Sequence, residues 1–283
     1  MRRTILVSMG DQHAGHKFGL MNPLTVLFDE DEQGNRMPYT PTPTAMQEYL
    51  WGIYLSDILI VIKIAGDDEI LLLNGGDEVH GNKYPQQLVS TRMSDQIIMA
   101  VANMEPWYAL QNVTHVRLVT GTGAHSFLEG SSTMLLCEFL KGKYPEIDTT
   151  VLNHGLLEYN GLKIDYSHHG PFPGSRDWLR GNVARFYLRD AMYQDIVHSN
   201  KPPDLVLRHH YHSPVHEMLE MNGYSSELYV LPSMCGLSEH ALQSSQSSYA
   251  LWNGILAIEI VDGEIVKRHK LYDLLDLRTK EVI

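Results

Sequence analysis

Aspartate and histidine residues follow several short apolar runs of this chain at spacings suited to metal binding. Asp11 and His13 are two residues apart, and His210 and His212 repeat this spacing. Carboxylates and neutral imidazoles are natural ligands of manganese, iron, zinc or nickel. Each pair places two ligands on one loop, and the two histidines can serve adjacent ions. The pairs therefore predict a metal site.

A third carboxylate, Asp77, follows the apolar run 70–73 and the glycines Gly75 and Gly76. Glycines let the backbone approach closely, as a carboxylate that bridges two ions needs. Each feature alone has a structural alternative, because an aspartate beside a glycine after a strand is usually a turn or a helix cap. Five apolar runs ending in Asp or His are hard to explain as turns alone, so the ordered set indicates metal chemistry.

The elements that must position these residues alternate between strand and helix up to the last motif, and only strands follow it. Apolar runs predict strands, and apolar residues at helical spacing predict helices. The expected strands are 4–8, 70–73, 115–120, 162–167, 204–207, 228–231, 255–261 and 264–271. The expected helices are 44–63, 94–110, 129–141 and 178–198. Because ligands gather outside the carboxyl ends of strands in α/β proteins, loops there would bring the Asp and His residues together.

The composition is ordinary for a globular protein, and the length allows one large domain or two small ones. A single domain spanning residues 1–283 is expected. The acidic, proline-rich segment 29–43 is expected to be an exposed loop. A net charge of −12 argues against a broad surface for duplex nucleic acid. Two bound divalent ions would add about +4 locally, so the net charge need not describe a metal-lined cleft.

The two cysteines, Cys137 and Cys235, form no CxxC motif and are expected to be half-buried free thiols in a reducing compartment. The N-terminal apolar run is too short for a signal peptide. The most apolar stretch, 58–65, contains a lysine and is far below membrane-spanning length. The sequence therefore predicts a cytoplasmic protein without membrane contact.

The order of the motifs resembles the calcineurin-like metallophosphoesterase family over residues 5–212. The motifs are Asp11-x-His13, Gly76-Asp77, a glycine-rich element ending in His125, His169-Gly170 and His210-x-His212. Gly19-Leu20 after the first motif, Ser94-Asp95-Gln96 and the Gly-Thr-x-Ala-His form of the third motif are similar to family members of phages and prophages.

The resemblance implies a four-layer αββα sandwich of two mixed β-sheets flanked by helices, with a dinuclear metal site at the strand ends. Strands within 228–271 would complete the sandwich. The implied cofactors are two divalent ions, with manganese expected and iron, zinc, nickel or magnesium as alternatives. The implied metal ligands are Asp11, His13 and His212 for one ion, His169 and His210 for the other, and Asp77 for both. His125 would protonate the leaving oxygen.

The third motif departs from the family pattern, in which an asparagine precedes the histidine and binds the second ion. Segment 121–125 has no asparagine, so Thr122 is a candidate ligand or supporting residue. His168 is a second candidate for either role; His169 is preferred as the ligand because the family ligand directly precedes a glycine. His80, three residues after Asp77, is a candidate substrate contact.

The implied function is a metal-dependent phosphoesterase, expected to be a phosphodiesterase acting on a nucleotide or nucleic-acid ester. In this family a hydroxide that bridges the two metals attacks phosphorus in line. The main alternative is a metal-binding family member with weak or no catalysis that serves docking or assembly. A two-metal hydrolase acting on amides has the right ligand types but lacks the matching motif order.

Overall fold

The computed structural model describes residues 2–127, 131–172, 177–237 and 250–281. The helices are α1 (Ala45–Ala65), α2 (Met93–Tyr108), α3 (Ser131–Lys143) and α4 (Arg180–Val197), with 3₁₀ turns at Pro85–Gln87 and Asp177–Leu179. The strands are β1 (Arg3–Met9), β2 (Leu27–Glu30), β3 (Arg36–Tyr39), β4 (Glu69–Asn74), β5 (Val113–Val119), β6 (Asp148–Leu152), β7 (His154–Tyr159), β8 (Leu162–Ser167), β9 (Leu205–Arg208), β10 (Val215–Met221), β11 (Tyr224–Val230), β12 (Ala250–Val261) and β13 (Glu264–Asp276).

Two mixed sheets form the centre of the molecule. The six-stranded sheet has the order β13-β12-β1-β4-β5-β6, in which β1, β4, β5 and β6 are parallel and β12 is antiparallel to both neighbours. The five-stranded sheet has the order β10-β11-β9-β8-β7, in which β8, β9 and β11 are parallel. The carboxyl ends of β1, β4 and β5 therefore meet at one edge of the first sheet, and those of β8 and β9 at one edge of the second.

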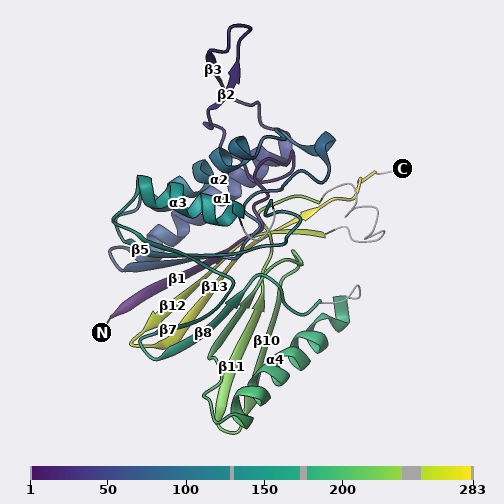
Figure 1. The fold of residues 1–283 in the computed structure, drawn as a ribbon. Coiled ribbons are helices and arrows are strands. Elements are labelled where there is room, and N and C mark those ends of the chain that lie inside the picture. Colours follow the sequence, from purple (N-terminus) through teal and green to yellow (C-terminus); the bar gives the residue numbers. More distant parts are fainter. Residues whose placement is uncertain (1, 128–130, 173–176, 238–249, 282–283) are drawn as a thin grey trace.

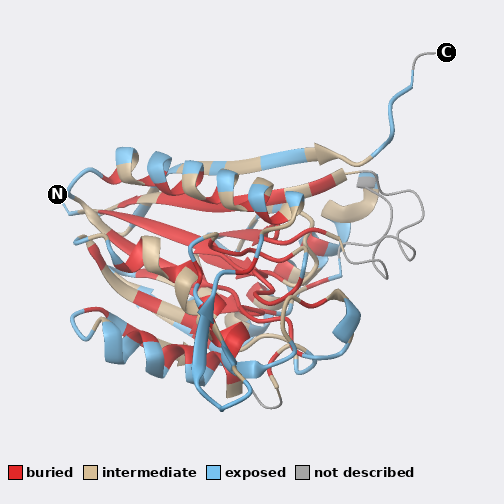
Figure 2. Cartoon of the chain, turned by 90° about the horizontal axis from the view of Figure 1, so that it is seen from above, coloured by how far each residue is buried: buried red, intermediate tan, exposed pale blue. Residues whose placement is uncertain are grey.

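Alternation of side chains along each strand creates three apolar layers. On β1, Ile5 and Val7 face the core shared with α1, α2 and α3, whereas Leu6 lies in the core between the two sheets. Helix α4 packs on the outer face of the five-stranded sheet, where Leu188 contacts Val206 and its neighbours. Figure 1 shows α1–α3 on one side and α4 on the other, and Figure 2 shows the buried strands between exposed helix faces. The expected αββα sandwich is confirmed.

Helix α1 begins where the proline-rich segment ends. The Thr44 hydroxyl accepts the Gln47 backbone N–H at 3.2 Å, and the Gln47 side chain accepts the Thr44 N–H at 3.0 Å. This reciprocal capping satisfies two backbone donors that a helix start leaves free. Gln47 also donates to the carbonyl of His16 at 3.0 Å, which ties the start of the helix to the loop after β1.

Several elements differ from those expected from the sequence. Segment 29–43 was expected to be a loop, but it contains most of an exposed hairpin of β2 and β3 that projects beyond the helices (Figure 1). Its turn is stabilised by Asp31, whose carboxylate accepts the backbone N–H groups of Gln33 and Asn35. Strands β6, β7 and β10 were not expected either. No helix among the described residues has both the length and the apolar character needed to cross a membrane.

Candidate metal centre

Backbone hydrogen bonds join the loops that follow the strands. The Asp11 N–H donates to Gly76 O at 2.9 Å, and the His13 N–H donates to Asp77 O at 2.9 Å. The Asp11 carboxylate in turn accepts the His210 N–H from the other sheet at 3.2 Å. The loops after β1, β4 and β9 are therefore held together by contacts that do not depend on an ion.

Five of the six residues predicted to bind metal have left-handed backbone conformations. Their φ angles are 52° for Asp11, 47° for His13, 51° for Asp77, 74° for His210 and 54° for His212. Residues other than glycine adopt this region rarely and at an energetic cost. Such conformations persist where the surrounding structure enforces them, and they concentrate at functional sites.

Four polar side-chain atoms, which we call the Thr122 group, lie close together and make five contacts. The Thr122 hydroxyl is 3.0 Å from Asp77 Oδ2, 3.2 Å from His168 Nε2 and 3.2 Å from His210 Nδ1. His168 Nε2 is 3.1 Å from Asp77 Oδ2 and 3.2 Å from His210 Nδ1. Two ligands of one tetrahedral ion at 2.0–2.1 Å are themselves about 3.3 Å apart. The Thr122 group therefore fits a divalent ion.

His168 and His169 occupy different positions beside this group. His168 is 1% exposed, and its Nδ1 donates to the carbonyl of Gly75 at 2.6 Å, which leaves Nε2 free for the group. His169 is exposed, and its ring centroid lies 4.5 Å from that of His210. Both residues are close enough to His210 to share an ion with it, but His168 is the one that contacts Asp77.

The pKa of His168 indicates that the buried carboxylates of this site favour a positive charge beside them. Burial lowers the pKa of His168, but the hydrogen bond and the charge of Asp77 outweigh burial and raise it to about 9. The imidazole would then be protonated at neutral pH and would balance the buried carboxylates. A bound cation can supply the same positive charge, and its binding would displace the proton.

A second set, which we call the Asp11 group, consists of Asp11, His13 and His212. Asp11 is fully buried. Within the part of the chain that the structure describes, its Oδ1 accepts no hydrogen bond, and it lies 3.3 Å from His212 Nε2. A buried carboxylate oxygen without a hydrogen bond is costly unless a cation compensates it. Burial disfavours the charged form of Asp11, but His212 and His209 outweigh it and lower its pKa well below the usual value. The Asp11 group therefore also fits an ion.

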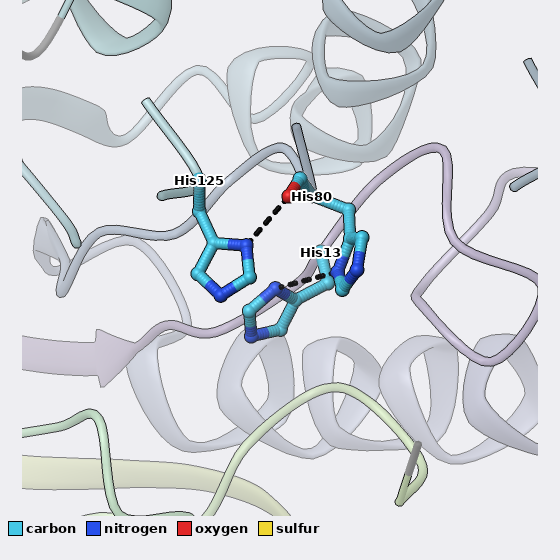
Figure 3. Close-up of side chains that lie close together, drawn as sticks. All are labelled: His13, His80 and His125. Carbon is cyan, nitrogen blue, oxygen red and sulfur yellow. Dashed lines mark hydrogen bonds between the residues drawn. The ribbon is translucent and has the colours of Figure 1, made fainter. Parts of the chain in front are cut away.

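His80 and His125 lie against His13 (Figure 3). The Nδ1 atoms of His80 and His13 are 3.3 Å apart, and His125 Nδ1 donates to the carbonyl of His80 at 2.5 Å. Burial, followed by the nearby His16 and His125, lowers the pKa of His80 to about 3. A neutral His80 can accept a hydrogen bond from the Nδ1–H of His13, and His125 keeps Nε2 free. The three imidazoles are close enough to hold an ion themselves.

Two residues that contact the candidate metal ligands were not predicted from the sequence. Cys235 Sγ lies 3.5 Å from His212 Nδ1, and His209 Nδ1 lies 3.7 Å from Asp11 Oδ2. His209 fills the space beside Gly75, where an added Cβ would lie 2.0 Å from the imidazole. The glycines before Asp77 were a signal for such a close approach. Nothing in the spacing of the motifs pointed to Cys235, which lies in the loop before β12.

The surface around the Thr122 group has room for a substrate. A cavity of about 330 Å³ next to it is lined by Thr120, Gly121, Asn153, His154, Ser167, His168, His169 and Tyr187. On another side, the ring of Tyr211 lies 4.8 Å from that of His210 and 5.2 Å from that of Phe172, between centroids. Phe172 is 60% exposed. An aromatic surface therefore begins one residue away from the candidate ligands.

The chain matches no protein-family model and no curated protein. Among solved structures it is similar to the sulfate thiohydrolase SoxB of Thermus thermophilus (11% identity, 98% of this chain and 57% of that chain, TM-score 0.36). It is also similar to the 5′-nucleotidase of Candida albicans (9% identity, 97% and 52%, TM-score 0.36) and to a protein of unknown function from Aquifex aeolicus (11% identity, 74% and 80%, TM-score 0.32). The chain spans just over half the length of the first two. At these TM-scores the similarities carry no argument about its activity.

Proposed function

We propose that this protein is a metal-dependent phosphoesterase of the calcineurin-like type. Its two divalent ions would bind to the Asp11 group and the Thr122 group, with Asp77 serving both. The observation that carries the proposal is the set of five contacts of 3.0–3.2 Å within the Thr122 group. Beside it lies a buried Asp11 oxygen that accepts no hydrogen bond from the described residues. Thr122 takes the place of the asparagine in the family pattern, and His168 rather than His169 is the proposed ligand.

Ions bound here would activate water and neutralise charge on the phosphoryl oxygens. The residues of the chain supply orientation and a proton. His125 Nδ1 is held by the carbonyl of His80, so its Nε2 is the atom that would donate a proton to the leaving oxygen. The backbone N–H of Thr122 donates to Asp77 Oδ1 at 2.6 Å and fixes the carboxylate between the two groups.

The proposed substrate is a phosphodiester of a nucleotide or of single-stranded nucleic acid. Tyr211 and Phe172 support this choice, because stacking of a base on an aromatic side chain contributes about 1–3 kcal/mol to binding. A net charge of −12 disfavours an extended duplex. Manganese is the first ion to test, followed by zinc, iron, nickel and magnesium.

The test is turnover of bis-p-nitrophenyl phosphate and of a short single-stranded oligonucleotide by metal-free protein to which each ion is returned. We expect activity that requires an added ion and that Asp77→Asn abolishes, because one carboxylate serves both ions. Asp67→Asn, in an exposed turn after α1, is the control. A wild-type protein that binds ions but cleaves no phosphoester would contradict the proposal and favour the docking alternative.

Tyr211→Ala and Phe172→Ala test the nature of the substrate. We expect both to raise KM for the oligonucleotide and to leave KM unchanged for an abasic oligomer of the same length. Equal effects on both substrates would remove the proposed role of the aromatic pair.

A further inference from the structure

Cys235 contacts one nitrogen of His212, and Asp11 contacts the other. Cys235 Sγ lies 3.5 Å from His212 Nδ1, and Asp11 Oδ1 lies 3.3 Å from His212 Nε2. Cys235 is 4% exposed, and it belongs with His13 and His212 to a cluster whose candidate ligand atoms lie within 4.8 Å of one another. No described residue donates a hydrogen bond to this Asp11 oxygen, so Nε2 of His212 faces the side where a cation would compensate the carboxylate.

We propose that Cys235 is a positioning residue for the metal site of the Asp11 group. Its sulfur accepts the Nδ1–H of His212 and keeps Nε2 turned toward Asp11. An imidazole nitrogen that binds an ion carries no proton, so the proton of a neutral ligand must reside on the other nitrogen. Metal-binding histidines usually donate this second N–H to a carboxylate, a carbonyl or water, and the partner fixes the tautomer and the ring orientation. This inference rests on the proposed metal centre.

The backbone around Cys235 is fixed by hydrogen bonds that do not involve the metal site. The Cys235 carbonyl accepts the Asn253 side-chain N–H at 2.9 Å and the Ser233 hydroxyl at 3.1 Å. The next residue, Gly236, donates its N–H to the carbonyl of Phe18 at 2.7 Å. Asn253 is fully buried on β12. The sulfur is therefore held by the six-stranded sheet and can orient His212, which comes from the five-stranded sheet.

The two cysteines provide a matched comparison. Cys137 is also buried and free, but it lies on α3 in the core under the helices, where its thiol donates to Thr149 O at 3.9 Å. A general effect of removing a buried thiol would be shared by Cys235→Ala and Cys137→Ala. An effect on ion binding through His212 would be confined to Cys235.

The experiment is titration of metal-free protein with manganese or zinc against a fluorescent chelator, in the absence of substrate. We expect Cys235→Ala to weaken one of two bound ions by about 10- to 100-fold and to leave the other unchanged. Cys235→Ser should recover most of the affinity, because a hydroxyl can also accept the N–H. Cys137→Ala should bind both ions as the wild type does.

A double-mutant cycle separates positioning from a general structural role. In a His212→Ala background, Cys235→Ala should cause no further loss of affinity, because its effect passes through the missing imidazole. Unfolding of the metal-free Cys235→Ser protein by urea provides a check that the comparison is made between folded proteins.

Three outcomes would overturn the inference. The first is a Cys235→Ala protein that binds both ions with wild-type affinity. The second is a loss of ion affinity on Cys235→Ala that is as large in the His212→Ala background as in the wild type. The third is a thiolate-to-metal charge-transfer band in the cobalt protein that Cys235→Ser removes, since the sulfur would then be a ligand itself. Ion binding is measured without turnover, so a protein that binds two ions but cleaves no phosphoester would contradict the proposed function alone.

Discussion

The contacts around Asp77 support the proposal that Thr122 takes the place of the asparagine in the family pattern. Thr122 contacts both oxygens of Asp77, through its N–H at 2.6 Å and its hydroxyl at 3.0 Å. Gly121 permits this approach, because a Cβ there would lie 2.0 Å from Asp77 Oδ1. A hydroxyl is a weaker metal ligand than a carboxylate or an imidazole. We therefore expect the ion of the Thr122 group to bind less tightly than that of the Asp11 group.

The neighbouring histidines allow a direct test of which one binds the ion. His168→Ala should weaken one bound ion by about 100-fold or more, whereas His169→Ala should leave ion binding close to the wild type. The reason is that His168 contacts Asp77 and Thr122, while His169 is exposed. Metal content and metal titration of the two variants provide the measurement. The opposite ranking would restore the choice of His169 made from the sequence.

His125 is expected to act on the leaving group and not on the ions. His125→Ala should lower kcat by roughly 10²- to 10⁴-fold for esters whose alkoxide leaving group needs a proton. It should spare p-nitrophenyl esters, whose leaving group departs unaided, and it should leave the metal content unchanged. His198→Ala, at the exposed end of α4, is the control. Loss of an ion together with equal loss on both esters would make His125 a ligand.

The gathering of the motifs at the strand ends could be predicted from the sequence, because each motif follows an apolar strand. The contacts between their side chains could not. His168 and His169 are adjacent, and the ring that turns inward is the one that contacts the carbonyl of Gly75 from a distant loop. The left-handed backbone of Asp11 and Asp77 is set by neighbouring loops and leaves no local signal. Cys235 precedes β12 in the chain and lies beside His212 through tertiary contacts, among them the bond from Asn253 of β12 to its carbonyl.

Among the elements, the long apolar strands and the four helices could be predicted from the sequence. Edge strand β10 was missed because its residues alternate between half-buried and exposed, and three of its seven residues are His or Glu. Strand β7 was missed for the same reason. The hairpin of β2 and β3 is exposed, and its acidic, proline-rich composition predicts a loop. Strands buried on both faces carry a clear signal, and half-exposed ones do not.

Helix α1 contains a buried carboxyl group that makes stability depend on pH. Burial, followed by the charge of Asp273, raises the pKa of Asp57 to about 8. Asp57 is 5% exposed, and its Oδ2 has no hydrogen bond to any residue that the structure describes. The folded protein therefore keeps this proton to higher pH than the unfolded chain does. The contribution of Asp57 to stability must fall as the pH rises from about 4 to about 8.

Removing this charge should stabilise the protein at high pH. We expect Asp57→Asn to raise the free energy of unfolding by about 2–5 kcal/mol at pH 8 and by much less at pH 5. Urea unfolding with a chelator present provides the measurement without interference from metal binding. Asp67→Asn, in the exposed turn after α1, should show no such difference between the two pH values. An equal effect of Asp57→Asn on the free energy of unfolding at both pH values would contradict the raised pKa of Asp57.

At the scale of the whole molecule, the proposed ions would link the two sheets. The Asp11 and Thr122 groups each combine residues after β1, β4 or β5 with residues after β8 or β9. Asp11 and Asp77 are buried in one cluster, and buried carboxylates held close together are costly unless positive charge compensates them. Ion binding should therefore stabilise the contact between the sheets as well as the loops.

Added ions should accordingly raise the unfolding temperature. An ion present at 100 times its Kd stabilises the folded state by about 2.7 kcal/mol. Thermal unfolding with and without a chelator measures the shift, which should be largely lost in Asp77→Asn. A shift of the same size in that variant would place the ions elsewhere.

The position of β1 also has a consequence for synthesis of the chain. β1 lies between β4 and β12 in its sheet, and about 176 residues separate the end of β4 at Asn74 from the start of β12 at Ala250. At about 5–20 residues per second, one edge of β1 stays uncovered for roughly 10–35 s after β4 has been made. An open strand edge can pair with other chains. Ribosome-bound chains that stop before β12 should therefore need chaperones, while chains that include β12 and β13 can close the sheet.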